Sequence, residues 1–204
     1  MTLVLLLWIS ALAVLAGGGW LLCPDGVCGV PLLDREGLRL AHDLRGPGLD
    51  GLMGAATWLG SFWLLLPLLT LAGLGVWRHD RRMAAFPLLS LLGATALAHL
   101  FKLAVERPRP DLYAVLGHIP LDASYPSAHT MQAVAVALSL AALAGSHRVY
   151  LAPFLLALAV LVAWSRLHLQ VHFASDVLFG AVAAGLWVAG LHRLLWRTPP
   201  RSGV

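Results

Sequence analysis

Charged residues are scarce in this sequence. Asp, Glu, Lys and Arg make up 12% of its 204 residues, whereas soluble domains carry about a quarter. Hydrophobic residues make up 59% of the chain, and the mean hydropathy is +0.81. So little charge excludes an ordinary soluble domain and predicts a protein whose solvent is lipid.

Internal repeats, low-complexity segments and stretches typical of a flexible linker are also absent from the sequence. A length of 204 residues is enough for one membrane domain and little else. We therefore expect a single domain over residues 1–204.

Long windows without any charged residue dominate the chain. They are 1–24, 51–77, 83–101, 123–147, 149–165 and 177–192. A helix needs about 20 mostly apolar residues to cross a bilayer, and the last window reaches that length by continuing through Arg193 to Trp196. Because backbone groups in lipid must be paired internally, the windows predict an all-α integral membrane protein with six transmembrane helices. The first window lacks the basic start of a cleaved signal peptide, so a retained helix is favoured over a signal.

Six crossings would place both chain ends on one side of the membrane. That side would hold one acid, Asp80, and seven cations: Arg78, Arg81, Arg82, Arg148, Arg193, Arg197 and Arg201. The other side would also hold seven cations, but four of them belong to the polar clusters described below. When those four are set aside, the positive-inside rule predicts a plasma (inner) membrane protein with cytoplasmic termini. Segments 102–126 and 166–176 would then face the periplasm or exterior.

Two features are expected on that outer side. Residues 32–45 place Leu38, Ala41 and Leu44 on one face of a short amphipathic helix, which ends at the GPG of 46–48. The only cysteines, Cys23 and Cys28, lie in CPDGVC. An oxidising exterior would permit a disulfide, and PDG favours a turn that brings them together. Two free thiols are an equal alternative.

Three polar clusters interrupt the apolar windows at the outer ends of the predicted helices, where they can converge on one site. They lie at 102–110, 125–130 and 165–176. Arginine and lysine side chains bind phosphate oxygens, so Lys102, Arg109 and Arg166 predict a phosphate pocket. Ser127 adds a hydroxyl, and Pro126 before it is typical of a helix start, whose backbone N–H groups attract anions.

The histidines and one aspartate add groups suited to catalysis. His172 and Asp176 are four residues apart, which on a helix puts them on one face. A carboxylate bonded to one ring nitrogen leaves the other nitrogen as a nucleophile or base. His129, from another segment, could donate a proton to a leaving oxygen. These groups together are what a phosphoryl transfer requires.

The residues alone leave other interpretations open. The cations are also typical of interfacial anchors, and the His172–Asp176 pair could be a structural hydrogen bond. A metal site is a third alternative, although the cations would repel a divalent ion. Its possible ligands are His129, His168, His172 and Asp176. His99, within an apolar window, is interpreted as a packing or hydrogen-bonding residue.

The clusters together resemble the signature of the type-2 phosphatidic acid phosphatase superfamily. The first block is Lys102 followed after six residues by Arg109 and Pro110. The second block comprises Pro126, Ser127, Ala128 and His129, with Ala128 where the family usually has glycine. The third block, with the expected spacing, comprises Ser165, Arg166, His172 and Asp176.

This resemblance implies a membrane lipid phosphatase without a metal or other cofactor. It assigns His172 as the nucleophile that forms a phosphohistidine, Asp176 as its orienting acid and His129 as the proton donor. The phosphate-binding groups would be Lys102, Arg109, Ser127, Ala128 and Arg166. The substrate would be a lipid phosphate or diphosphate in the bilayer, such as undecaprenyl diphosphate, phosphatidic acid or phosphatidylglycerophosphate, and no nucleic-acid partner is expected. A lipid phosphotransferase and a non-catalytic lipid-phosphate binding or transport protein are the alternatives.

Overall fold

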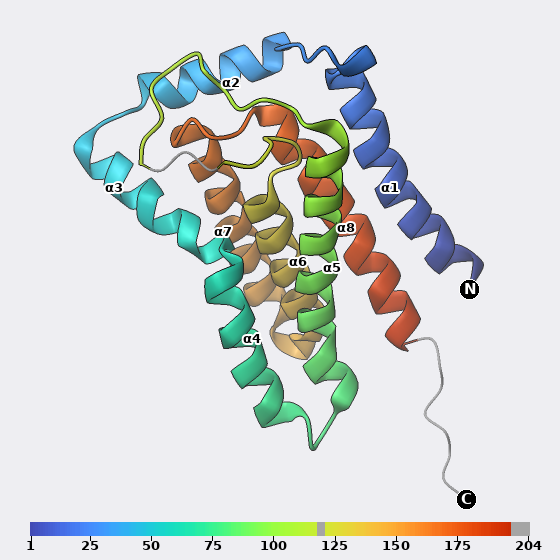
Figure 1. Ribbon diagram of the computed structural model, residues 1–204. Coiled ribbons are helices and arrows are strands. Elements are labelled where there is room, and N and C mark those ends of the chain that lie inside the picture. Colours follow the sequence, from blue (N-terminus) through green and yellow to red (C-terminus); the bar gives the residue numbers. More distant parts are fainter. Residues whose placement is uncertain (118–120, 197–204) are drawn as a thin grey trace, which may run out of the picture.

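The computed structural model describes residues 1–117 and 121–196, and within these ranges its regular elements are all helices (Figure 1). The longer helices are α1 (Thr2–Leu22), α4 (Phe62–Val76), α5 (Arg81–Val105), α6 (Ala128–Leu143), α7 (Arg148–His168) and α8 (Ala174–Trp196). The shorter elements are η1 (Pro24–Gly26), α2 (Leu32–Asp43), α3 (Pro47–Ala56), η2 (Thr57–Gly60) and η3 (Gly145–His147). The all-α prediction is confirmed. Arg197 and Arg201, expected at the basic end, lie outside the described residues.

Several of these helices are long and apolar enough to cross a membrane. They are α1, α5, α7 together with η3, and α8. A fifth span results if α3 with η2 and α4 form one segment, although the two parts are bent by 49°. Helix α6 has 16 residues, which is about 24 Å at a rise of 1.5 Å per residue. The protein is therefore a multi-pass membrane protein with four to five apolar spans.

Two of the predicted windows differ from the helices that form. Window 51–77 is not one straight helix, because it is divided among α3, η2 and α4. Window 123–147 is helical only from Ala128. The residues before it form a loop in which Ser124 contacts Asp176. Both departures occur where the chain meets the predicted polar clusters.

Gly60 lies at the break before α4. A Cβ atom at Gly60 would lie 2.5 Å from Cγ1 of Val162 and 2.8 Å from the backbone oxygen of His129. Only glycine permits that approach. Ser61 then adopts an extended conformation, and α4 starts against the N-terminal end of α6.

Helix α6 lies at the centre, in contact with α5, α7 and α8, while α1 packs along α8 (Figure 1). The Trp8 and Trp187 rings stack at 5.2 Å between centroids, so α1 is an integral part of the bundle. Large apolar side chains on the outer helix surfaces remain exposed, including Ile9, Leu71 and Val160. This exposure suits a surface covered by lipid chains.

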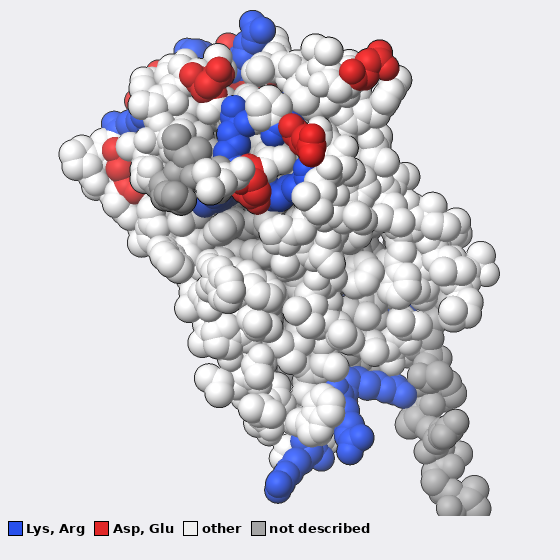
Figure 2. All heavy atoms as spheres, in the orientation of Figure 1, with Lys and Arg blue, Asp and Glu red and all other residues white. Residues whose placement is uncertain are grey.

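The charged residues divide between the two ends of the bundle. The start of α1, the α4–α5 connection and the last turn of α8 lie at one end (Figure 1). On the face drawn in Figure 2, that end carries Lys and Arg without visible acids, whereas the opposite end carries both signs around a hollow. This division matches the predicted separation of the cations.

Helix α2 lies across the mixed-charge end. Leu38 and Ala41 are buried as predicted, but Leu44 follows the helix and is 49% exposed. The prediction for Leu44 is wrong because the helix ends at Asp43. The buried face of α2 packs on α7 and α8, so protein covers it. The Cys23–Cys28 disulfide, which closes the turn before α2, is confirmed.

Candidate functional site

A cavity of about 190 Å³ opens at the mixed-charge end of the bundle. Six of the eight predicted site residues line it: Lys102, Arg109, Ala128, His129, Arg166 and His172. They come from the last turns of α5 and α7, the first turn of α6, and the loops after α5 and α7. The tertiary structure thus brings all three sequence clusters into one place.

His172 lies in the loop before α8, so the predicted arrangement with Asp176 on one helix face is wrong. The pair forms instead between this loop and the first turn of α8, with 3.6 Å between Nδ1 of His172 and Oδ2 of Asp176. Nε2 of His172 lies 3.4 Å from Nη1 of Arg109. Nε2 is therefore the ring nitrogen that faces Arg109.

Burial lowers the pKa of His172 well below its ordinary value, and the positive charges of Lys102 and Arg109 lower it further. The imidazole is therefore neutral at neutral pH. A neutral ring keeps the lone pair that a nucleophile requires.

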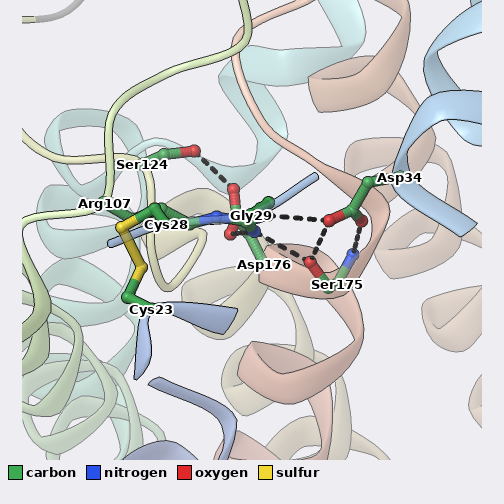
Figure 3. Close-up of a disulfide and its surroundings, with 8 residues drawn as sticks. All are labelled: Cys23, Cys28, Gly29, Asp34, Arg107, Ser124, Ser175 and Asp176. Carbon is green, nitrogen blue, oxygen red and sulfur yellow. Dashed lines mark hydrogen bonds and ion pairs between the residues drawn. A yellow bond between two sulfur atoms is a disulfide. The ribbon is translucent and has the colours of Figure 1, made fainter. Parts of the chain in front are cut away.

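Asp176 does not line the cavity, because it is completely buried behind His172. Its Oδ2 accepts hydrogen bonds from the Ser124 hydroxyl and from the backbone N–H of Phe173, the latter at 2.9 Å. Its Oδ1 accepts one from Nη1 of Arg107 at 2.6 Å. These three donors fix the carboxylate, as Figure 3 shows for Ser124 and Arg107.

Arg107 links Asp176 to the segment that carries the disulfide (Figure 3). Its Nη2 donates to Oδ2 of Asp34 at 2.8 Å and to the Gly29 carbonyl at 3.0 Å. Asp34 also accepts from the backbone and hydroxyl of Ser175 at 2.8 and 2.7 Å. Arg107 and both aspartates are completely buried, so each charge depends on its partners for stabilisation.

Lys102 and Arg109 both bind the segment 122–123. Nη2 of Arg109 lies 2.5 Å from Oδ1 of Asp122, and Nζ of Lys102 lies 3.3 Å from Oδ2 of the same carboxylate. Nζ of Lys102 also donates to the Ala123 carbonyl. Nη1 of Arg109 donates to the Val171 carbonyl at 2.6 Å, which places this arginine beside His172.

Arg166 approaches the cavity from the last turn of α7. Its side chain is 5% exposed, and Nη1 donates to the Thr57 hydroxyl in η2. Its buried Nε has no hydrogen-bond partner within 1–117 and 121–196. The guanidinium therefore retains donors that a phosphate could use.

Ser127 precedes α6 but does not line the cavity. It is completely buried, and its Oγ accepts a hydrogen bond from the Thr130 hydroxyl at 3.0 Å. The structure thus does not bring this hydroxyl to the predicted position, whereas Ala128 and His129 in the first turn of α6 do line the cavity. The backbone N–H groups at the start of α6 remain as groups suited to an anion.

The alternative metal site is not formed by the described part of the chain. His168 is buried and its Nε2 lies 2.7 Å from Oδ1 of Asp50 in α3, away from the cavity. The described residues contain no cluster of three His, Cys, Asp or Glu side chains with a geometry that could hold a metal ion.

The interpretation of His99 as a packing or hydrogen-bonding residue does not fit the described part of the chain, where its side chain has no hydrogen-bond partner. Its side chain is exposed and lines two cavities, the 190 Å³ cavity and an adjoining one of about 630 Å³. Both cavities also share Lys102, Arg109 and Asp122. Lys102 and Arg109 therefore stand between the 190 Å³ cavity, which lies further in, and the 630 Å³ cavity outside it.

Sequence reasoning missed Asp34, Arg107, Asp122 and Ser124 as parts of the site. One signal was present for Asp34, which precedes Leu38 by four residues and Ala41 by seven, and so lies on the buried face of α2. Arg107 begins the first of two Arg-Pro pairs in ERPRP. The motif spacing from Lys102 selects Arg109, and no pattern gives Arg107 a role. No local pattern distinguishes Asp122 or Ser124.

Known proteins resemble this chain in sequence. It is 34% identical over 145 residues to phosphatidylglycerophosphatase B of Bacillus subtilis (strain 168), which covers 67% of this chain and 70% of that protein. It is 33% identical over 149 residues to decaprenylphosphoryl-5-phosphoribose phosphatase of Mycobacterium tuberculosis (strain ATCC 25618 / H37Rv), which covers 69% of this chain and 78% of that protein.

Solved structures resemble it in fold. The crystal structure of the first transmembrane PAP2 type phosphatidylglycerolphosphate phosphatase from Bacillus subtilis superposes with a TM-score of 0.80 and 28% identity, covering 98% of this chain and 100% of that one. LpxE of Aquifex aeolicus gives 0.65 and 26%, covering 79% of this chain and 96% of that one.

The family model of the PAP2 superfamily matches residues 84–200, more than half of the chain. This range includes all three polar clusters and every described residue of α6, α7 and α8. With the relatives above, it confirms the resemblance that the cluster spacing indicated: the chain belongs to the PAP2 superfamily.

Proposed function

We propose that this protein is a lipid phosphatase that releases phosphate from a membrane lipid phosphate or diphosphate through a phosphohistidine at His172. One observation carries the proposal. A neutral His172 lines the same 190 Å³ cavity as His129 and the three cations Lys102, Arg109 and Arg166. A nucleophile, a proton donor and a charge clamp thus share one space.

The reaction would proceed in two balanced steps. Nε2 of His172 attacks phosphorus, so that a P–N bond forms while the P–O bond to the lipid breaks. The negative charge of the bound phosphate favours the protonated form of His129, which then gives its proton to the leaving oxygen. Water then attacks the phosphohistidine and loses a proton to His129, and the P–N bond breaks to release phosphate and restore His172.

The remaining groups would stabilise charge during both steps. Asp176, held by Arg107, Ser124 and the Phe173 backbone, faces Nδ1 of His172 and offsets the positive charge that the ring gains on attack. Lys102, Arg109 and Arg166 bind the phosphoryl oxygens, with backbone N–H groups of Ala128 and His129 at the start of α6. Ser127 would act through this helix start.

The membrane arrangement forms part of the same proposal. A single domain would cross the plasma (inner) membrane six times, with the bent α3–α4 pair and the short α6 each counted as one crossing. Both termini would be cytoplasmic and the cavity would face the periplasm or exterior. Phe62 and Trp63 line the cavity at the start of α4, and Trp63 is 80% exposed, which supports lateral entry of a lipid.

The names of the relatives guide the choice of substrate. Phosphatidylglycerophosphatase B and decaprenylphosphoryl-5-phosphoribose phosphatase favour phosphatidylglycerophosphate and a polyprenyl phosphoribose phosphate as first candidates. Undecaprenyl diphosphate and phosphatidic acid complete the panel.

The test is phosphate release by the purified protein in detergent micelles against this panel. His172→Asn should abolish turnover while the protein stays folded. His147→Asn, an exposed histidine in η3 at the opposite end of the bundle, is the matched control and should keep full activity. Full activity of folded His172→Asn would refute the mechanism.

Product analysis separates the remaining candidates. A phosphotransferase would transfer the labelled phosphoryl group to a second lipid in place of releasing free phosphate. A binding or transport protein would form neither product. After rapid quench under alkaline conditions, the wild-type protein should carry the phosphoryl label, and His172 should be the only labelled residue. Excess EDTA should leave the rate unchanged; loss of activity that added metal restores would favour a metal-dependent reaction.

Orientation can be measured on intact cells. In a background with Cys23→Ser and Cys28→Ser, a cysteine at exposed Asp111 should react with an impermeant thiol reagent, whereas one at exposed His79 should react only after the membrane is opened. The reverse pattern would invert the topology.

A further inference from the structure

Asp122 occupies the position of an anion at the candidate site. Its carboxylate lies 2.5 Å from Arg109 through one oxygen and 3.3 Å from Lys102 through the other. Carboxylate and phosphate oxygens use the same donors on arginine and lysine. The two cations that would bind phosphate from this side of the cavity are therefore already paired with an internal acid.

The third cation differs from these two. Arg166 lines the same cavity, but its hydrogen-bond partner is the uncharged Thr57 hydroxyl, and its buried Nε has no partner in the described part of the chain. Arg166 therefore keeps its full charge for a ligand, whereas the charges of Lys102 and Arg109 are partly neutralised by one carboxylate.

The Asp122 carboxyl group is ionised beside Lys102 and Arg109. Burial raises the pKa of its carboxyl group, but the charges of Lys102 and Arg109 outweigh this effect and lower the pKa below its ordinary value. A phosphate bound to the same cations would lie within a few ångströms of this negative charge. Simultaneous binding of the phosphate and the Asp122 carboxylate is therefore unfavourable.

The carboxylate also has space to move. The Asp122 side chain is 45% exposed, while Lys102 and Arg109 are 4% and 11% exposed. Asp122 lines the outer 630 Å³ cavity as well as the inner one. The carboxylate therefore has open space beside it, into which it can turn away from the two cations.

We propose that Asp122 is an internal anion that competes with the substrate phosphate for Lys102 and Arg109. When no substrate is bound, Asp122 pairs with Lys102 and Arg109, so neither cation is left without a partner charge. After hydrolysis the Asp122 carboxylate returns to the two cations and weakens their binding of free phosphate. Asp122 thereby lowers the affinity of the site for both substrate and product. This inference rests on the proposed phosphatase function.

Competition by inorganic phosphate tests the proposal. Asp122→Asn keeps the shape but removes the charge, so the inhibition constant of inorganic phosphate should fall roughly tenfold, since a carboxylate at this distance in a partly exposed site opposes a second anion. Asp122→Ser, which shortens the side chain, should act in the same direction and serves if the Asn variant does not fold. Asp111→Asn is the control, because it removes the same charge from an exposed position after Arg109, and it should change the constant less than about twofold.

A second readout does not depend on turnover. The rise in melting temperature of the purified protein should be recorded against the concentration of inorganic phosphate, and half of the rise should come at a lower concentration in Asp122→Asn than in wild type. Unchanged or weaker phosphate binding in folded Asp122 variants would overturn the inference, because the carboxylate would then be a neutral bystander or an aid to the cations. Tighter phosphate binding without turnover of any lipid phosphate would support the inference and refute the phosphatase function, so the two failures are distinguishable.

Discussion

Nη1 of Arg107 donates a hydrogen bond to Oδ1 of Asp176 at 2.6 Å, and both side chains are completely buried. Asp176 faces the proposed nucleophile His172 with its other oxygen, Oδ2. Arg107 therefore holds the proposed orienting acid, Asp176, by the oxygen that does not face the histidine. Through Asp34 and Gly29, it also joins the site to the segment after α1.

Replacement of Arg107 should reduce both stability and activity. In Arg107→Lys one charge remains, but a single ammonium cannot reach Asp34, Asp176 and Gly29 together. Loss of partners for buried charges should lower the free energy of unfolding by about 3 kcal/mol and slow phosphate release. Arg39→Lys is the control, since the exposed Arg39–Glu36 pair contributes only about 0–1 kcal/mol. Equal melting curves for the two variants would contradict this role of Arg107.

Arg166→Lys should lower kcat/KM by roughly 30-fold to 100-fold, because a point charge cannot replace a planar guanidinium on a phosphoryl group. The fold should persist, since Arg166 donates to the hydroxyl of Thr57, which is uncharged. Arg148→Lys, at the exposed start of the same helix α7, is a matched control with unchanged kinetics expected. Steady-state phosphate release measures both, and wild-type kinetics for Arg166→Lys would remove this residue from the site.

The pH dependence should reflect the lowered pKa of His172. Attack requires the neutral ring, so the protonated fraction, which grows as pH falls below the pKa, is inactive. Because burial and nearby cations place that pKa well below its ordinary value, kcat/KM should not fall through titration of His172 between neutral pH and about 6.5. Two substrates with different phosphate pKa values separate the enzyme's titration from the substrate's. An acid limb common to both substrates and centred near 6.5 or above would be inconsistent with a neutral, buried nucleophile.

The Cys23–Cys28 disulfide should stabilise the protein modestly. A bond that closes so short a loop contributes about 2 kcal/mol, and it restrains the segment in which the Gly29 carbonyl accepts from Arg107. A reductant should lower the melting temperature of wild type but not of a Cys23→Ser, Cys28→Ser double variant, which should also keep more activity than Arg107→Lys. Full labelling of both cysteines in the unreduced, denatured protein would exclude the bond.

The sequence by itself determined the membrane class, the helical fold and most of the candidate site. Charge-free windows locate the apolar helices because an uncompensated charge in lipid is costly, and this requirement is local to each segment. The sequence also indicated one pocket for Lys102, Arg109, His129, Arg166 and His172, because polar residues at the same end of neighbouring helices can converge. These signals depend on residue type and order alone.

The tertiary structure alone decided how the polar groups pair. His168 bonds to Asp50 in α3 and stays outside the cavity, while His99 is exposed at its rim. Arg107 is buried between Asp34 and Asp176, two acids that are 142 residues apart in the chain. Pairing of this kind depends on which buried charges the packed helices bring within about 3 Å of each other. That distance follows from the packing of the whole bundle, which no local sequence pattern specifies.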